Sequence, residues 1–251
     1  MFLTLALQAF KMNNMKIAII GAGNMGGAIA AGLAKGKIVK SGNIICTART
    51  QKTLDKIKAI DPEIAVTTDN IMAVKEADVV ILAVKPWLME NVISGFREHA
   101  APSGKIFVSV AAGITLDQLC TWISPACPSE VCSFRAIPNT AASVLASMTF
   151  IASANADAEQ IRLVTDIFDE MGCTMYVEER LIPAGTALAS CGIAFAMRYI
   201  RAAAEGGVEI GFRPEEIDKV TTAGGITIKG LNEMEHEGFT SAVIKGLKAC
   251  L

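Results

Sequence analysis

Short apolar runs alternate with helical stretches along most of the chain. The expected strands are 17–20, 44–47, 63–67, 78–84, 105–110, 130–137, 148–152 and 175–177. The expected helices are 24–35, 51–60, 70–75, 86–97, 116–123 and 156–171. The clearest strands are short runs of valine and isoleucine, which are typical of parallel strands buried on both faces. This order predicts an α/β fold with a Rossmann-like, doubly wound sheet.

The pattern changes after Glu178, where the strand-like runs end and a nearly continuous helix extends over Pro183–Glu209. We therefore expect a dinucleotide-binding domain over 15–178 and a small all-helical domain over 179–251. A segment of this length is small for an independent core.

Residues 1–14 are interpreted as an N-terminal extension. The stretch Met1–Phe10 is apolar but lacks the basic segment and the cleavage pattern of a signal peptide. A later start methionine, Met12 or Met15, is the expected explanation.

Three glycines stand between the first strand and the first helix. Gly21, Gly23 and Gly26 form the pattern G-x-G-x-x-G. The first glycine permits a tight turn, the second leaves room for a pyrophosphate, and the third allows the helix to pack closely. The N-terminus of that helix presents N–H groups and a positive dipole end to phosphates. The motif at this junction predicts dinucleotide binding.

No acidic residue follows the second strand, where an acid would bind the ribose 2′-hydroxyl of NAD. Arg49 and Lys52 stand there instead and can pair with a 2′-phosphate, helped by the hydroxyl of Thr47 or Thr50. A solvated basic turn is the alternative interpretation. The position favours NADP as cofactor, with NADPH preferred over NADH.

Three more strand ends carry candidate chemistry, because ligands of open α/β sheets bind at the carboxyl edge. They are Leu-Ala-Val-Lys-Pro over 82–86, Ser-Val-Ala-Ala-Gly over 109–113 and Arg-Ala-Ile-Pro-Asn-Thr over 135–140. The small residues of the second suit close passage of a flat nicotinamide. Lys85 has a plain alternative, an ordinary surface lysine.

A glycine-containing turn marks the second domain. The stretch 220–230 reads Val-Thr-Thr-Ala-Gly-Gly-Ile-Thr-Ile-Lys-Gly and precedes a helix expected to begin near Thr227. Exposed N–H groups at such a helix start suit a carboxylate. An ordinary threonine N-cap explains the same residues, and the two interpretations are compatible.

Composition narrows the classes of partner. The formal net charge of −2 gives no electrostatic footprint for nucleic acid or an anionic membrane. No apolar run is expected to be long enough to cross a bilayer. The two histidines, His99 and His236, lie in no metal-ligand spacing, so no metal is expected. The seven cysteines form no C-x-x-C pair, which favours buried thiols in the cytoplasm over a secreted disulfide framework.

The long helix of the second domain is apolar on most of its faces over Ala184–Ala204. A helix that is apolar all round must be buried on all sides, and a small segment cannot wrap it alone. We therefore expect a homodimer or a higher homo-oligomer, built from the helical domain.

Taken together, the motifs at 21–26, 82–86, 109–113, 135–140 and 221–231 resemble those of pyrroline-5-carboxylate reductases, from Lys16 to near the C-terminus. The last motif is the specific one. The resemblance implies a Rossmann domain, a helical dimerisation domain and reduction of the cyclic imine Δ1-pyrroline-5-carboxylate to L-proline with NAD(P)H. This reaction is the last step of proline biosynthesis.

The resemblance also implies roles for individual residues. The cofactor-binding residues would be Ile20, Gly21, Ala22, Gly23, Asn24 and Met25 at the pyrophosphate, Asn70 on the adenosine side, and Leu82, Ala83, Val84 and Lys85 along the dinucleotide. The substrate-binding residues would be Thr222, Gly224 and Gly225 at the carboxylate, together with Asn139. The hydroxyl of Thr227 would bond the ring nitrogen, which makes it the expected catalytic residue.

The chain departs from the family pattern at two places. Ser190-Cys-Gly-Ile193 replaces the family's usual Ser-Gly-Pro, and only Glu215–Lys219 stands where the family has a helical segment of roughly 30 residues. Either this protein lacks that segment or residues are missing from the sequence. Two alternatives are a β-hydroxyacid dehydrogenase, which would need a lysine that the helix 183–209 lacks, and a non-catalytic NADP-binding sensor.

Overall fold

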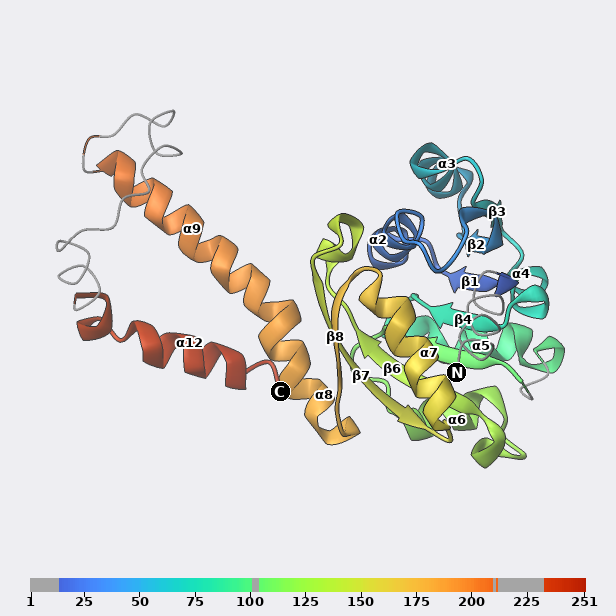
Figure 1. Cartoon of the computed structure of the whole chain (residues 1–251). Coiled ribbons are helices and arrows are strands. Elements are labelled where there is room, and N and C mark those ends of the chain that lie inside the picture. Colours follow the sequence, from blue (N-terminus) through green and yellow to red (C-terminus); the bar gives the residue numbers. More distant parts are fainter. Residues whose placement is uncertain (1–13, 101–103, 210, 212–232) are drawn as a thin grey trace, which may run out of the picture. The chain divides into compact units, whose positions relative to one another are not determined.

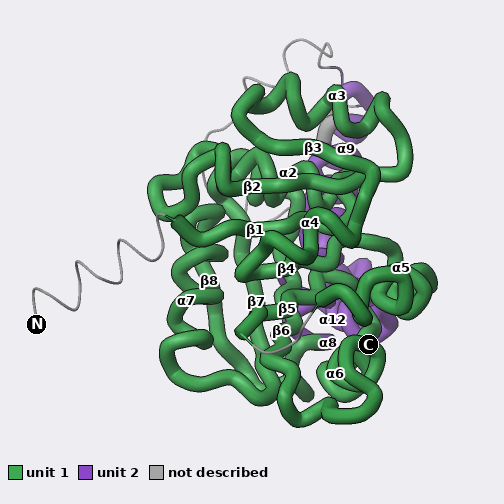
Figure 2. The backbone as a smooth tube through the Cα atoms, turned by 90° about the vertical axis from the view of Figure 1, so that its right-hand side faces the viewer, with its two compact units in different colours: residues 1–182 green, residues 183–251 purple. Residues whose placement is uncertain are grey.

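The structure is a computed structural model that describes residues 14–100, 104–209, 211 and 233–251. The chain divides into two compact units between Ile182 and Pro183, and Figure 2 colours them separately. The division lies a few residues beyond the boundary expected near Glu178. Each unit is described by itself below.

The described part of the first unit contains one eight-stranded sheet, in the order β3-β2-β1-β4-β5-β6-β7-β8 (Figure 1). Its strands are β1 (Ile17–Ile20), β2 (Ile44–Thr47), β3 (Ala65–Thr67), β4 (Val79–Leu82), β5 (Ile106–Ser109), β6 (Cys132–Ile137), β7 (Ser147–Ala154) and β8 (Gly172–Tyr176). The first six run parallel, β7 runs antiparallel to β6, and β8 runs parallel to β7. The expected Rossmann-like fold is confirmed, whereas the reversal at β7 was not foreseen.

The helices of this unit are α2 (Asn24–Leu33), α3 (Gln51–Ile60), α4 (Asn70–Glu76), α5 (Met89–Phe96), α6 (Leu116–Ile123) and α7 (Ala158–Asp169). Short 3₁₀ turns are η1 (Ser41–Asn43), η2 (Pro86–Leu88), η3 (Arg97–His99), η4 (Pro128–Glu130), η5 (Thr140–Val144) and η6 (Glu179–Leu181). Polar side chains fix several starts. Asp69 caps α4, while Thr115 and Asp157 form capping boxes at α6 and α7.

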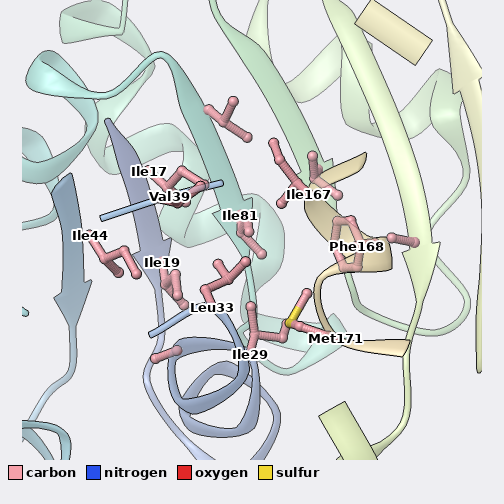
Figure 3. Packing of buried hydrophobic residues seen from close by; sticks show 14 of the residues in the cluster. Ile17, Ile19, Ile29, Leu33, Val39, Ile44, Ile81, Ile167, Phe168 and Met171 are labelled. Carbon is pink, nitrogen blue, oxygen red and sulfur yellow. The ribbon is translucent and has the colours of Figure 1, made fainter. Parts of the chain in front are cut away.

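The central strands β1, β4, β5 and β6 are buried on both faces, as their apolar composition predicts, whereas the edge strands β3 and β8 are not. Ile17 and Ile19 join the hydrophobic cluster under α2 and α7, part of which Figure 3 shows. The alternate residues Ala18 and Ile20 join a second cluster, under α4, α5 and α6. Because successive side chains of a strand point to opposite faces, a strand between two helical layers needs apolar residues at every position.

The second unit contains helices in its described residues. The expected continuous helix is present from Ile182 to Glu209 as α8 (Ile182–Gly185), a π-helical stretch η7 (Thr186–Cys191) and α9 (Gly192–Glu209). After the undescribed residues 212–232, α12 (Phe239–Lys248) follows. The π-helical stretch has no counterpart in the sequence prediction.

One helical span in the described residues, Glu179–Ala203, is long and apolar enough to cross a membrane by length and composition alone. The expectation that no such run exists is therefore wrong. Only 17% of its most apolar window is buried, and Leu188, Met197 and Ile200 are exposed. An apolar helix of this kind requires a covering surface, which either lipid or protein can supply.

Gly172 at the start of β8 is the position where we expect a single methyl group to be least tolerated. Its φ is +147°, and an added Cβ would overlap the backbone of Ser147 on β7. Gly172→Ala is expected to lower the free energy of unfolding by about 2 kcal/mol or more, measured by chemical denaturation. Gly95→Ala is the matched control, because Gly95 is helical and has open space at its Cβ position. It is expected to stabilise by about 0.5–1 kcal/mol, and equal losses in both variants would contradict the steric argument.

Candidate cofactor and active site

Four parallel strands bring their carboxyl ends into one row. Ile20 on β1 is paired in register with Thr47 on β2 and Leu82 on β4, and Leu82 is paired with Ser109 on β5. Backbone hydrogen bonds continue the row past the strand ends, since the Ala83 N–H donates to the Ile20 carbonyl at 2.9 Å. Segments 20–25, 47–52, 82–85 and 109–113, which lie far apart in the sequence, therefore follow one edge of the sheet.

The three fingerprint glycines have three different surroundings. Gly21 has a φ of +98°, and an added Cβ would stand 2.7 Å from Cγ1 of Val84. At Gly26 an added Cβ would overlap the Gly21 carbonyl oxygen, so the helix can sit this close only with glycine. No atom lies within 4 Å of the Cβ position of Gly23. The structure thus places the turn glycine, the open glycine and the packing glycine as the motif predicts.

Thr47 holds the glycine turn in place. Its carbonyl accepts hydrogen bonds from the N–H groups of Gly21 at 3.2 Å and Ala22 at 2.7 Å, and its hydroxyl accepts from Gly21 at 3.2 Å. The side chain is buried at 1% exposure. The expectation that this hydroxyl helps to bind a 2′-phosphate is wrong, because burial and the bond to Gly21 keep it under the turn.

The N-terminus of α2 fits a phosphate. Gly23 is its N-cap residue and supplies no side-chain hydrogen bond, so the first helical N–H groups have no side-chain cap there. Gly23 and Asn24 are exposed and Met25 is half-buried. Uncapped N–H groups, a positive dipole end and open space above Gly23 are the features that a pyrophosphate requires.

The residues after β2 and β3 lie beside this turn. Arg49 and Lys52 are both exposed, and the N-cap of α3, Thr50, makes no side-chain capping bond; its hydroxyl lies 3.0 Å from that of Thr53. Asn70 is half-buried in the first turn of α4, after β3. Two cations and an uncapped helix start therefore stand where a second phosphate group would be recognised.

The segment after β4 forms the next part of the edge. Leu82 is buried, Ala83 and Val84 are half-buried, and Lys85 is exposed. The Lys85 ammonium lies 6.0 Å from the ring centroid of Trp87, a contact that the sequence analysis did not anticipate. The backbone of this segment is thus held against the glycine turn, while its cation faces solvent.

Asn139 lies beyond β6 at the same edge, but its described bonds are structural. The residue is 6% exposed, its Oδ1 accepts from the Ala141 N–H at 3.0 Å as the cap of η5, and its N–H donates to the Ser147 hydroxyl at 3.1 Å. Its expected part in substrate binding stays a prediction. The expected substrate residues Thr222, Gly224 and Gly225 and the expected catalytic residue Thr227 lie outside the described residues.

The sequence analysis did not predict a buried ion pair at Arg135, which is paired in register with Ser109. Arg135 on β6 donates to Oε1 of Glu179 at 2.9 Å, and the same oxygen accepts from the Leu116 N–H, at the start of α6, at 2.7 Å. The Arg135 side chain is only 7% exposed. An arginine inside an apolar strand predicts a buried acidic partner. The sequence does not identify Glu179 as that partner, because the two residues lie 44 positions apart.

Comparisons with known proteins agree with this geometry. A family profile described as NADP oxidoreductase coenzyme F420-dependent matches residues 16–113, which contain the edge from β1 to the turn after β5. A second profile, described as pyrroline-5-carboxylate reductase dimerisation, matches residues 214–251.

Two relatives that align with most of this chain are pyrroline-5-carboxylate reductases of Dictyostelium discoideum. Pyrroline-5-carboxylate reductase 2 of Dictyostelium discoideum is 34% identical over 276 aligned positions, covering 94% of this chain and 90% of that protein. The chain belongs to the pyrroline-5-carboxylate reductase family. Pyrroline-5-carboxylate reductase 1 of the same organism is also 34% identical, and this chain spans about half, 49%, of its length.

A solved pyrroline carboxylate reductase of Plasmodium falciparum, with NADP bound, has the same fold as this family member. The TM-score is 0.82 at 23% identity, over 95% of this chain and 96% of that one. The alignment with the second Dictyostelium reductase is longer than the 251 residues of this chain, so it includes positions that have no counterpart here. Such gaps are in keeping with the short stretch Glu215–Lys219.

Two glycine variants separate cofactor binding from folding in this reductase. Gly23→Ala places a methyl group in the open space at the turn, so we expect NADPH affinity to fall at least about tenfold with little change in thermal stability. Gly26→Ala places the methyl against the Gly21 carbonyl and is expected to lower stability instead. Fluorescence titration with NADPH and thermal unfolding measure the two effects. Unchanged NADPH affinity in the folded Gly23 variant would exclude the turn as the pyrophosphate site.

Proposed function

We propose that this protein reduces Δ1-pyrroline-5-carboxylate to L-proline and uses NADPH in preference to NADH. The proposal rests on one observation: a member of the reductase family has a single sheet edge where the expected cofactor segments meet. These segments are 20–25, 82–85 and 109–113. The decisive experiment measures NADPH oxidation with pyrroline-5-carboxylate as substrate. Detection of proline as the product excludes simple loss of NADPH.

The residues of the first unit bind and orient the cofactor. The α2 N-terminus and the glycine turn hold the pyrophosphate, Leu82–Lys85 line the dinucleotide, and Asn70 contacts its adenosine side. Arg49 and Lys52, beside the uncapped start of α3, hold the 2′-phosphate. When bound, the nicotinamide supplies a hydride for the imine carbon.

The residues of the second unit position the imine. The backbone around Thr222, Gly224 and Gly225 binds its carboxylate, and the Thr227 hydroxyl hydrogen-bonds its ring nitrogen. A protonated imine is already electrophilic, so a strong general acid is not required. Positioning of the two reactants then accounts for most of the rate enhancement.

We further propose a homo-oligomer in the cytoplasm, with a second copy covering α9. The dimerisation profile over residues 214–251 supports a homo-oligomer, although it does not include α9. A second copy would give the exposed apolar residues Leu188 on η7 and Met197 and Ile200 on α9 a protein surface rather than lipid. All seven cysteines are free thiols in the structure, which suits a reducing compartment.

A non-catalytic NADP-binding sensor is the second candidate. The short stretch Glu215–Lys219 keeps this candidate open, because a shortened second unit could retain cofactor binding and lose turnover. Tight NADPH binding without oxidation by pyrroline-5-carboxylate would support the sensor. The β-hydroxyacid dehydrogenase alternative is disfavoured, because the helix 182–209 contains no lysine.

Arg49→Ala is expected to raise the KM for NADPH about tenfold or more and to leave that for NADH little changed. The reason is the loss of a charge-assisted bond to the 2′-phosphate, which is worth about 1.5–3 kcal/mol. Steady-state kinetics with both cofactors measures the effect. Lys56→Ala, another exposed cation on α3, is the matched control and is expected to change neither KM. Equal losses with both cofactors would refute a phosphate contact.

Thr227→Ala is expected to lower kcat/KM for the imine by about 1.5–3 kcal/mol, or roughly 10- to 150-fold, without abolishing NADPH binding. Thr227→Ser retains the hydroxyl and is expected to keep most of the activity. Kinetics of the two variants beside NADPH titration separates a substrate contact from a folding defect. Unchanged kinetics in the alanine variant would remove Thr227 from the site.

Light scattering at micromolar concentration is expected to show a dimer or a larger oligomer. Met197→Glu adds a charge at a 61% exposed position of α9, so it is expected to weaken the assembly. Met72→Glu, a 41% exposed methionine on α4, is the matched control and is expected to leave the assembly intact. A stable wild-type monomer would contradict the proposed assembly.

A further inference from the structure

Two helices of the second unit, α9 and α12, contact each other in antiparallel order. The rings of Tyr199 and Phe239 lie 6.1 Å apart between centroids. One turn earlier on α9, the Phe195 ring lies 3.7 Å from the Cβ position of Gly246 on α12. Since the residue number falls along α9 while it rises along α12, the contact continues toward η7, the stretch before α9, and η7 also contacts α12.

Each side of this contact carries a cysteine, Cys191 at the end of η7 and Cys250 two residues after α12. The Cys191 thiol is hydrogen-bonded to the Cys250 side chain. The Cys250 Sγ also donates to the Gly246 carbonyl at 3.3 Å, so its thiol is directed back along α12. Figure 1 shows the C-terminal end of α12 reaching the first part of α9. Two thiols from distant segments therefore meet where the helices converge.

The two thiols differ in access. Cys250 is exposed, whereas Cys191, the last residue of η7, is half-buried. Burial raises the pKa of the Cys191 thiol above its ordinary value. Cys250 is the exposed thiol of the two, so it is the one that a dissolved oxidant reaches first.

The remaining cysteines provide internal comparisons. Burial raises the pKa of Cys46 to about 12 and of Cys132 to about 11, which keeps both as inert thiols. Cys127 and Cys173 are exposed on the first unit. An exposed thiol at Cys173 therefore matches Cys250 in access and lies outside the helix pair.

We propose that Cys191 and Cys250 are a redox modification site that forms a reversible intramolecular disulfide between η7 and the end of α12. The oxidant is a small disulfide of the glutathione type. The Cys250 thiolate attacks one sulfur of glutathione disulfide and releases one glutathione thiolate. Cys191 then loses its proton and attacks the Cys250 sulfur, which releases a second glutathione. Two protein thiols are oxidised to one disulfide, and one glutathione disulfide is reduced to two thiols.

The disulfide would link η7 to the end of α12 and so stabilise the loosely packed helices α9 and α12. A cavity of about 590 Å³ lies between them, lined mostly by apolar side chains such as Phe195, Met234 and Val243. The disulfide closes a loop of roughly 60 residues, and such a link removes freedom mainly from the unfolded chain. Oxidation is therefore expected to raise the midpoint of thermal unfolding by at least about 2–4 °C.

The test uses the purified full chain, first reduced and then equilibrated in buffers of rising glutathione disulfide content. Free thiols are counted after denaturation, and a non-reducing tryptic digest is read by mass spectrometry. The expected count falls from seven to five. Peptides 181–198 and 249–251 are expected as one linked species, two hydrogen atoms lighter than their sum. The linked peptide must be absent from Cys191→Ser and from Cys250→Ser, and it must still form in Cys173→Ser.

Other outcomes would overturn the proposal. A glutathione adduct that persists on Cys250 beside a free Cys191 would show that the second thiol cannot resolve it. A link between two chains through Cys250, seen on a non-reducing gel, would assign the thiol to another partner. Seven free thiols at every glutathione ratio would exclude the site. The rise in the midpoint of thermal unfolding must occur in oxidised wild type and be lost in Cys250→Ser. A Cys191–Cys250 disulfide that forms without this rise would refute the claim that it stabilises the helix pair.

Discussion

The cofactor edge depends on the close approach of α2 to its neighbours, which glycine alone permits. Near its start, Gly26 touches the Gly21 carbonyl. Near its end, the Cβ position of Gly32 lies 2.5 Å from the Ala142 carbonyl oxygen in η5. One helix therefore packs against both the glycine turn and the segment that follows β6. Interiors this densely packed do not accommodate an extra methyl group without displacement of the backbone.

Two nearby residues of the same edge differ in their exposure. Thr47 is buried and stabilises the turn, whereas Arg49, two residues later, is exposed. Behind the edge, Glu179 accepts hydrogen bonds from Arg135 and from the start of α6, close to the division between the two units. Loss of either partner would leave a charge without compensation, which makes this pair a strong constraint on the local structure.

In the second unit, the apolar surface of α9 is the feature that connects structure to assembly. Apolar residues such as Met197 and Ile200 are exposed on it, beside exposed charged ones such as Arg201, and in an isolated chain the apolar ones lie in water at an energetic cost. The dimerisation profile matches residues 214–251, which include α12 but not α9. Cys191, at the end of the preceding η7, meets Cys250, so the proposed interface and the proposed disulfide lie on neighbouring parts of the second unit.

The sequence alone determined the sheet, the glycine turn and the family, because each depends on local signals. A run such as Ile17–Ile20 has apolar side chains on both faces of its strand, so it is stable only between two apolar layers. The three glycines of the turn lie within six consecutive residues, so their motif can be read directly from the sequence. Only the tertiary structure decided the antiparallel β7, the buried role of Thr47, the partner of Arg135 and the meeting of Cys191 with Cys250. These features arise from contacts between residues far apart in sequence, and neither periodicity nor spacing encodes which distant partner a side chain will meet.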